Sequence, residues 1–440
     1  MRRKQRVGMG RPRRGATLVF VAVFAVALVA MAAFVIDLSR LYVGTNELQT
    51  GADAAALRGA LQLQYDPAQS PASVTTSFAT SNQALNQPVT LAGADVTPVF
   101  WNPAGSPKAT ILNAWTNANA VQVSASRNTG LLFGKLLSEV SPTPQRKSIA
   151  WVANITRVAC PTPWGFPLIS LNEHLYPSGG SVNYAVTPTI YADLDSVLKS
   201  TNGPQSLTMI FWPPSHLENG STKQIPKQIG TDSAFYALAS SINEYADQIA
   251  APKSKCFNSI IEIDQSEASG VFPGQGTGSV QKKTVNGVQG DGPANKLPGL
   301  CETAGLPSNR ADCWPKGTTL FTGQTPGVTV TVAWVGAIAG SNVPVRTIGG
   351  FRIMCVYRSA GGGAGGGNGK GNGGNGSGGG GERCEWLDGT NNGFFTSRGV
   401  STPYDEGTIV GYPVTTYPGL GNGVVLGNAP SLAQRLILVR

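Results

Sequence analysis

The chain has 440 residues, of which 13% are charged and 41% hydrophobic, with 56 glycines and 30 prolines. Seven bases and no acid lie in residues 1–14, and subtracting those seven from the formal net charge of +9 leaves +2 for the rest. The positive charge therefore describes a terminal tail, which argues against a nucleic-acid-binding surface.

The first predicted element is a transmembrane helix over residues 15–36. Residues 16–36 are 21 in a row without a charge, and a helix of that length spans about 30 Å, the thickness of a bilayer core. The basic tail 1–14 on its N-terminal flank predicts a cytoplasmic N-terminus and a periplasmic or extracellular bulk. The alternative is a cleaved signal peptide ending near Ala30 and Ala32, but the apolar segment is longer than such peptides need.

An amphipathic helix is predicted over residues 37–64, as a continuation of the first, until Pro67 ends it. Its apolar positions recur at helical spacing among charges: Leu38, Leu41, Leu48, Leu57 and Leu61. Gly44 and Gly51 weaken the helical propensity. A separate amphipathic helix lying on the surface of the next domain fits the pattern nearly as well.

Small residues form a stripe on this segment, at Ala52, Ala55, Ala56 and Gly59. Small side chains let helices approach closely, so the stripe fits association with other helices in the membrane. It fits packing on the chain's own domain equally well.

The N-terminal residues resemble a known family. The order and spacing of residues 13–16 (RRGA), 36–42 (IDLSRLY), 47–49 (ELQ) and 52–57 (ADAAAL) are similar to the N-terminal module of TadG-like proteins. That family belongs to the tight-adherence (Tad, or Flp) pilus-assembly system. A weaker resemblance, to a strand, a loop and a strand, covers residues 121–126, 131–134 and 149–153. The family-motif positions are Gly15, Asp37, Arg40, Leu48, Gln49 and Asp53.

Two positions depart from the family's patterns. Pilin-like relatives carry Glu five residues after the processing glycine, where this chain has Phe20. That departure argues against cleavage after Gly15 and against a role as a filament subunit. Many TadG-like proteins also hold a metal in an Asp-x-Ser-x-Ser pattern, whereas residues 264–268 here begin with Asp264 and end in Ala268. We expect no metal and no cofactor.

The rest of the chain predicts an α+β or mostly β exported part. We divide it into a strand and loop region at 65–159, an α+β domain at 160–358, a Gly-rich flexible loop at 359–383 and a C-terminal β segment at 384–440. One helix is expected over 235–249, with Asp232 or Ser233 as its N-cap. Strands are expected at 207–213, 259–263, 328–332, 348–355, 407–413 and 436–439.

All six cysteines follow the anchor, which predicts disulfides formed in an oxidising compartment. The six are Cys160, Cys256, Cys301, Cys313, Cys355 and Cys384. Their pairing is open among 15 arrangements, and we favour Cys301 with Cys313 and Cys355 with Cys384. By elimination, Cys160 then joins Cys256. No C-x-x-C, H-E-x-x-H or Gly-x-Ser-x-Gly motif occurs, and the two histidines, His174 and His216, lie in ordinary contexts.

These features lead to three ranked hypotheses. The first is a membrane-anchored, non-enzymatic component of Tad/Flp-type pilus assembly or surface secretion, with the membrane and other pilus-assembly proteins as partners, no nucleic acid, and an open oligomeric state. The second is an exported adhesin or binding module, whose sign would be exposed aromatic residues at a groove. The third is an exported hydrolase, whose sign would be a buried His beside a Ser or a carboxylate.

Overall fold

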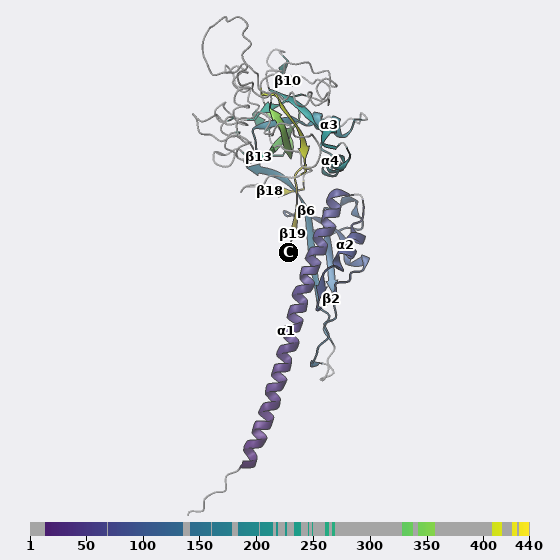
Figure 1. Ribbon diagram of the computed structural model, residues 1–440, viewed down its shortest axis with the longest axis vertical. Coiled ribbons are helices and arrows are strands. Elements are labelled where there is room, and N and C mark those ends of the chain that lie inside the picture. Colours follow the sequence, from purple (N-terminus) through teal and green to yellow (C-terminus); the bar gives the residue numbers. More distant parts are fainter. Residues whose placement is uncertain are drawn as a thin grey trace, which may run out of the picture.

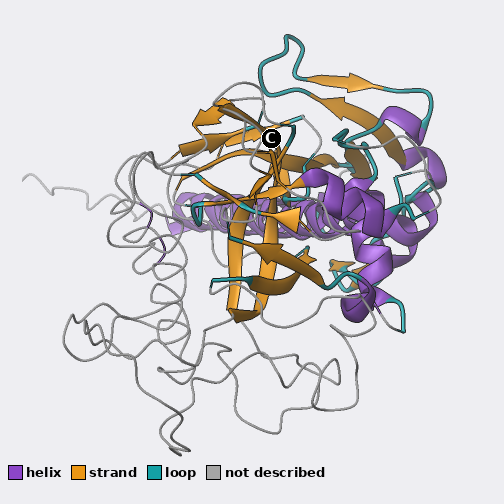
Figure 2. Cartoon of the chain, turned by 90° about the horizontal axis from the view of Figure 1, so that it is seen from above, coloured by secondary structure: helices purple, strands orange, loops and turns teal. Residues whose placement is uncertain are grey.

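A computed structural model describes residues 14–67, 69–134, 141–159, 161–177, 184–201, 203–213, 217–218, 225–226, 233–238, 245, 249, 260–263, 266–268, 328–337, 342–356, 407–415, 425–428 and 431–439. One long helix, α1, runs from the bottom to the middle of the molecule, and two β-sheets lie at its upper end (Figure 1). Seen from above, the strands of both sheets gather beside the helices (Figure 2). The predicted α+β class, with an N-terminal apolar helix followed by β-rich sheets, is confirmed in that coarse form.

Helix α1 spans Arg14–Tyr65 without a break. It ends two residues before Pro67, as proline's effect on helices predicts. The predicted apolar helix and amphipathic helix are therefore one element, and its second half lies on the domain surface. Both sequence interpretations were thus right in part: the helix is continuous, and its amphipathic half packs on a domain.

The first sheet has the strand order β13-β6-β5-β3-β4, and β18 and β19 also pair with β6. Its longer strands β5 and β6 are antiparallel and match the predicted strand, loop and strand. The strands are β3 (Val96–Trp101), β4 (Ala109–Ile111), β5 (Ala120–Ser126), β6 (Gln145–Ala159), β13 (Ile260–Glu262), β18 (Val425–Gly427) and β19 (Gln434–Val439). We call this sheet, with α2, the proximal module, and the second half of α1 packs on it.

Short elements complete the proximal module. Helix α2 (Ala72–Ala79) packs on α1, in a region that the sequence indicated to be irregular with a few strands. The two-residue strands β1 (Gln83–Ala84) and β2 (Gln87–Pro88) form a hairpin whose turn, Leu85 and Asn86, has φ of 53° and 60°. The 3₁₀ turns η1 (Gly93–Asp95) and η2 (Trp115–Asn117) lie beside β3.

The second sheet has the order β11-β8-β17-β16-β15-β7-β12, with β14 paired to β16. Its strands are β7 (Trp164–Pro167), β8 (Met209–Trp212), β11 (Ser233–Ala234), β12 (Tyr236–Ala237), β14 (Ser266–Ala268), β15 (Val328–Val335), β16 (Asn342–Val356) and β17 (Ile409–Val414). Helices α3 (Leu168–Leu175), α4 (Ile190–Lys199) and α5 (Gly203–Ser206) accompany it. A separate pair of short strands is β9 (Leu217–Glu218) and β10 (Ile225–Pro226). We call the second sheet and these helices the distal module.

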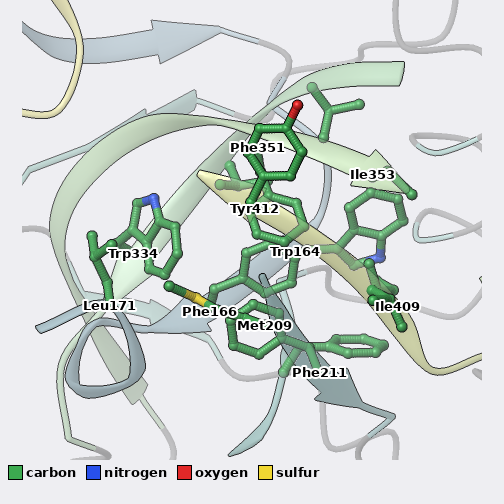
Figure 3. Packing of buried hydrophobic residues seen from close by; sticks show 14 of the residues in the cluster. Trp164, Phe166, Leu171, Met209, Phe211, Trp334, Phe351, Ile353, Ile409 and Tyr412 are labelled. Carbon is green, nitrogen blue, oxygen red and sulfur yellow. The ribbon is translucent and has the colours of Figure 1, made fainter. Parts of the chain in front are cut away.

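Large aromatic side chains fill the core of the distal module (Figure 3). Phe166 and Phe211 stack with ring centroids 4.1 Å apart, and Trp334 and Phe351 meet them at steep angles. Trp164 donates a hydrogen bond from its indole N–H to the hydroxyl of Tyr245 at 2.8 Å. Such ring pairs add to the stability gained by burial alone.

The predicted helix over residues 235–249 is wrong at its start. Residues 233–237 form β11 and β12, which pair with β8 and β7, respectively. Phe235 and Leu238 are buried between and beside those strands. At Phe235 and Leu238 long-range strand pairing overrode the helical spacing, because tertiary contacts outweigh local propensity. Tyr245 and Ile249, later in the same pattern, are helical. Most of residues 239–249 lie outside the described residues.

Candidate functional site: the Asp37 clasp

The first half of α1 exposes its side chains, and we call it the bare half. From Leu18 to Ile36 its large apolar side chains are exposed, and α1 is the one helix of the described residues that is long and apolar enough to cross a membrane. In water a surface of this kind is strongly unfavourable, since each large apolar side chain left exposed forgoes about 1.5–3 kcal/mol of burial. This half of the helix therefore needs a non-aqueous environment.

Asp37 follows directly on the apolar stretch and is only 7% exposed. Three successive backbone N–H groups donate to its carboxylate: Leu132 to Oδ1 at 2.7 Å, Phe133 to Oδ2 at 3.0 Å and Gly134 to Oδ2 at 2.7 Å. Consecutive N–H groups that converge on one anion form a concave nest, and hydrogen bonds to a charged acceptor are strong ones. We call this arrangement the Asp37 clasp.

The clasp favours the ionised form of Asp37, which lies outside the apolar segment. Burial raises the pKa of this carboxyl group. The hydrogen bonds from Leu132, Gly134 and Phe133 and the nearby charge of Arg40 together lower the pKa by more, so the net shift is downward from 3.8. A carboxylate that accepts several backbone N–H groups is stabilised in its charged state. Asp37 is therefore a fixed negative charge that holds a loop.

The loop of the clasp is the extension of the β5–β6 hairpin. Arg127 donates its N–H to the carbonyl of Pro144 at 3.2 Å, and Thr129 donates both its N–H and its hydroxyl to the carbonyl of Pro142 at 3.0 Å. These bonds fix the two sides of the hairpin beyond the last paired strand residues. The sheet thereby presents residues 132–134 to α1 in one orientation.

The other family-motif positions hold α1 against the proximal module or lie along it. Leu48 is buried in the core between helix and sheet. Gln49 donates from Nε2 to Asp53 Oδ1 at 2.7 Å and to the carbonyl of Lys147 in β6 at 3.4 Å. Gly15 lies in the first turn of α1, 22 residues before the clasp. The structure thus places Asp37, Leu48 and Gln49 at one interface, with Arg40 near Asp37 and Asp53 bonded to Gln49, and leaves Gly15 apart from it.

A second carboxylate repeats the pattern of the clasp higher on the same helix. Glu47 accepts the N–H of Leu85 at 2.6 Å, at the tight turn between β1 and β2. Leu85 also lies against Gly44, where an added Cβ would approach the leucine side chain within 2.8 Å. Helix α1 therefore binds two separate loops through acidic side chains.

The stripe of small residues packs within the chain. Ala52, Ala55 and Ala56 have no exposed surface, and an added Cβ at Gly59 would collide with Thr75 Oγ1 of α2 and meet Val121 of β5. The alternative of packing on the chain's own domain is therefore correct for this stripe. Gly51 acts alike, because a Cβ there would lie 3.0 Å from Val89.

In the distal module, His174, Tyr176 and Asp193 make hydrogen bonds to neighbouring groups. His174, on α3, contacts the carbonyl of Ser170 through Nδ1 at 2.7 Å, an ordinary contact within a helix. Burial and a hydrogen bond to Asp193 raise the pKa of Tyr176 to about 12, so this hydroxyl stays protonated. Asp193 also accepts the hydroxyl of Thr189 at 2.8 Å, which ties Tyr176 to the start of α4.

Several sequence predictions fall on residues outside the described part. These are His216, Asp264, the Gly-rich loop and every cysteine except Cys355, whose backbone lies in β16. Residues 266–268 form strand β14. Among the described residues no group of three or more His, Cys, Asp or Glu side chains is placed to hold a metal ion. The disulfide pairing and the domain boundaries stay predictions.

A long helix with a bare apolar half and a sheet-packed half is typical of proteins held to a membrane by one terminal helix. Residues 15–62 match the family model described as "Putative Flp pilus-assembly TadE/G-like". The resemblance to TadG-like proteins is thereby confirmed over α1. Searches of the curated proteins and of the solved structures found no match to this chain.

The sequence marked Asp37 and residues 131–134 separately but did not join them. The pairing needs the β5–β6 hairpin to fold back along α1, and the two segments are 95–97 residues apart. One signal was available: an acidic residue at the end of an apolar helix needs a partner, since an unpaired buried charge is costly.

Proposed function

We propose that this chain is a membrane-anchored, non-enzymatic component of Tad/Flp-type pilus assembly or of a related surface secretion apparatus. The N-terminus lies in the cytoplasm and both sheets lie on the outer side of the membrane. The observation that carries the proposal is the family match over residues 15–62, which coincides with the helix that bears the clasp.

The clasp supports a mechanical role for α1. Three hydrogen bonds at Asp37 and the contact of Glu47 with Leu85 fix the helix to the proximal module at two heights. A helix fixed in this way holds the sheet at a set distance and orientation from the membrane. Its partners are other pilus-assembly proteins that contact the exported sheets.

The two modules are also fixed to each other. Ile155 of β6 donates its N–H to the carbonyl of Ala433 at 2.8 Å, and the preceding residue, Leu432, donates its N–H to Thr347 Oγ1 of β16 at 3.0 Å. At the end of α1, Tyr65 lies beside Tyr191 of α4, with the ammonium of Lys199 4.0 Å from its ring centre. These contacts hold the distal module in place on the proximal module and α1, as an assembly scaffold requires.

The test is the amount of sheared surface pilin in a strain that lacks this chain. We expect deletion to abolish surface pili and the wild-type chain to restore them. The variant Asp37→Ala should restore them poorly at equal protein level, because the carboxylate of the clasp is gone. Asp66→Ala, at the opposite end of the packed half of α1, is the matched control and should restore pili fully. Pili that are unchanged by deletion would refute the assembly role and make binding of an outside ligand the leading hypothesis.

A further inference from the structure

The clasp holds two exposed apolar side chains at the point where the bare half of α1 ends. Leu132 is 53% exposed and Phe133 is 42% exposed, although the N–H groups of both are bonded to Asp37. Asp37 directly follows the uncharged residues 16–36, which match the thickness of a bilayer core. The loop after β5 extends along α1 toward this half of the helix (Figure 1).

We infer that Leu132 and Phe133 enter the interfacial layer of the bilayer that α1 crosses and form a second membrane contact. This inference rests on the proposed anchoring by α1. It adds that the proximal module itself touches the lipid, through Leu132 and Phe133 in the connection from β5 to β6. The occupant of this apolar surface is thus the lipid surface.

The backbone N–H groups of the loop are already hydrogen-bonded, as contact with lipid requires. Irregular backbone is costly near lipid because its N–H groups lose their water partners. Here the N–H groups of Leu132, Phe133 and Gly134 all donate to one carboxylate. Asp37 thereby removes the main cost of bringing the loop to the membrane.

The charge pattern agrees with contact at this depth. Residues 128–134 carry no ionisable side chain. On α1, Leu38 and Tyr42 are exposed just beyond Asp37, and Tyr42 lies roughly 7 Å further along the helix axis at 1.5 Å per residue. Tyrosine is enriched at the headgroup level of membranes. Apolar tips, a tyrosine and a paired carboxylate thus share one narrow layer.

The test places a fluorophore at the loop of the full-length chain, reconstituted in two sets of phosphatidylcholine–phosphatidylglycerol vesicles, which carry bromine on the acyl chains either near the headgroup or near the bilayer centre. Phe133→Trp is the test variant. Phe100→Trp, at an exposed phenylalanine on β3, is the matched negative control, and Phe24→Trp, in the bare half of α1, reports on anchoring. The wild-type chain gives the background of its eight native tryptophans.

We expect the added emission of Phe133→Trp to be largely quenched by bromine, that of Phe24→Trp to depend on where bromine is placed along the acyl chain, and that of Phe100→Trp to be unaffected. Adding Asp37→Asn to Phe133→Trp should remove most of the quenching at the loop. Quenching of Phe24→Trp with none at Phe133→Trp or at the companion variant Leu132→Trp would overturn the inference while anchoring stands. No quenching of Phe24→Trp in either set of vesicles would overturn the anchoring as well.

Discussion

The proximal and distal modules stabilise their cores in opposite ways. In the proximal module α1 lies on the sheet through Ala52, Ala55, Ala56 and Ala60, none of which has exposed surface. In the distal module the sheet is covered by large rings, among them Phe166, Phe211, Trp334 and Phe351. The first core depends on close approach of backbones, and the second depends on the volume of side chains.

The difference follows from whether a long helix covers the sheet. A straight helix lying along a sheet gains most contact where side chains are small, because dispersion attraction falls steeply with distance. The described part of the distal module has only short helices, so bulky side chains fill the space over its sheet. Loss of side-chain volume should therefore destabilise the distal module most, and gain of side-chain volume should destabilise the proximal module most.

Removal of volume should harm the distal module most. Phe351→Ala empties the centre of the ring cluster and should lower the free energy of unfolding by about 3–5 kcal/mol. The measurement is denaturant unfolding of the detergent-solubilised chain, followed by tryptophan fluorescence. Phe100→Ala, at an exposed ring on β3, is the control and should cost far less. Equal losses would mean that the rings of Figure 3 are not a tightly packed core.

Removal of the last strand tests how far the proximal module depends on the end of the chain. A chain that ends at Ala433 lacks β19, which pairs with β6 from Ile149 to Asn154 and brings Leu436 and Leu438 against the α1 core. Two half-buried leucines correspond to roughly 2–3 kcal/mol of lost stability. A chain that ends at Val439 is the control. Unchanged protease resistance of residues 14–159 would show that β19 is dispensable.

Addition of volume should harm the proximal module. Helix propensity alone favours Gly59→Ala by about 1 kcal/mol, but the new Cβ would collide with Thr75 Oγ1, whose hydroxyl is bonded to the carbonyl of Pro71. Overpacking costs about 1–3 kcal/mol, so we expect net destabilisation in the same unfolding assay. Gly93→Ala, where nothing lies within 4 Å of the new Cβ, should be neutral. A stabilised Gly59→Ala would contradict the close approach of α1 and α2.

Acid should open the clasp, and at neutral pH the clasp should stay closed. The pKa of Asp37 is lowered in the folded state from 3.8. Its stabilisation is therefore complete above that value and is lost as the pH falls through the lower folded-state pKa. Hydrogen exchange at residues 132–134, corrected for the intrinsic rate, should accelerate at acidic pH in the wild-type chain. In Asp37→Asn it should be fast throughout, and a wild-type loop that stays protected at low pH would argue against the carboxylate's role.

The sequence by itself determined the local elements of this protein. An uninterrupted apolar run and leucine spacing suffice for one helix that ends near Pro67, and alternating Val and Thr residues suffice for β15, because these patterns depend on near neighbours. The family resemblance rested on the same local residues. The sequence also showed Asp37 as a charge at the end of an apolar segment, without its partner.

The tertiary structure alone decided which distant segments meet. It paired Asp37 with residues 132–134, joined β19 to β6, turned residues 233–237 into strands and placed the small-residue stripe inside the chain. None of these follows from local pattern, because strand pairing and loop capture depend on contacts between segments far apart in sequence. The helix was a property of its residues, and its partners were a property of the fold.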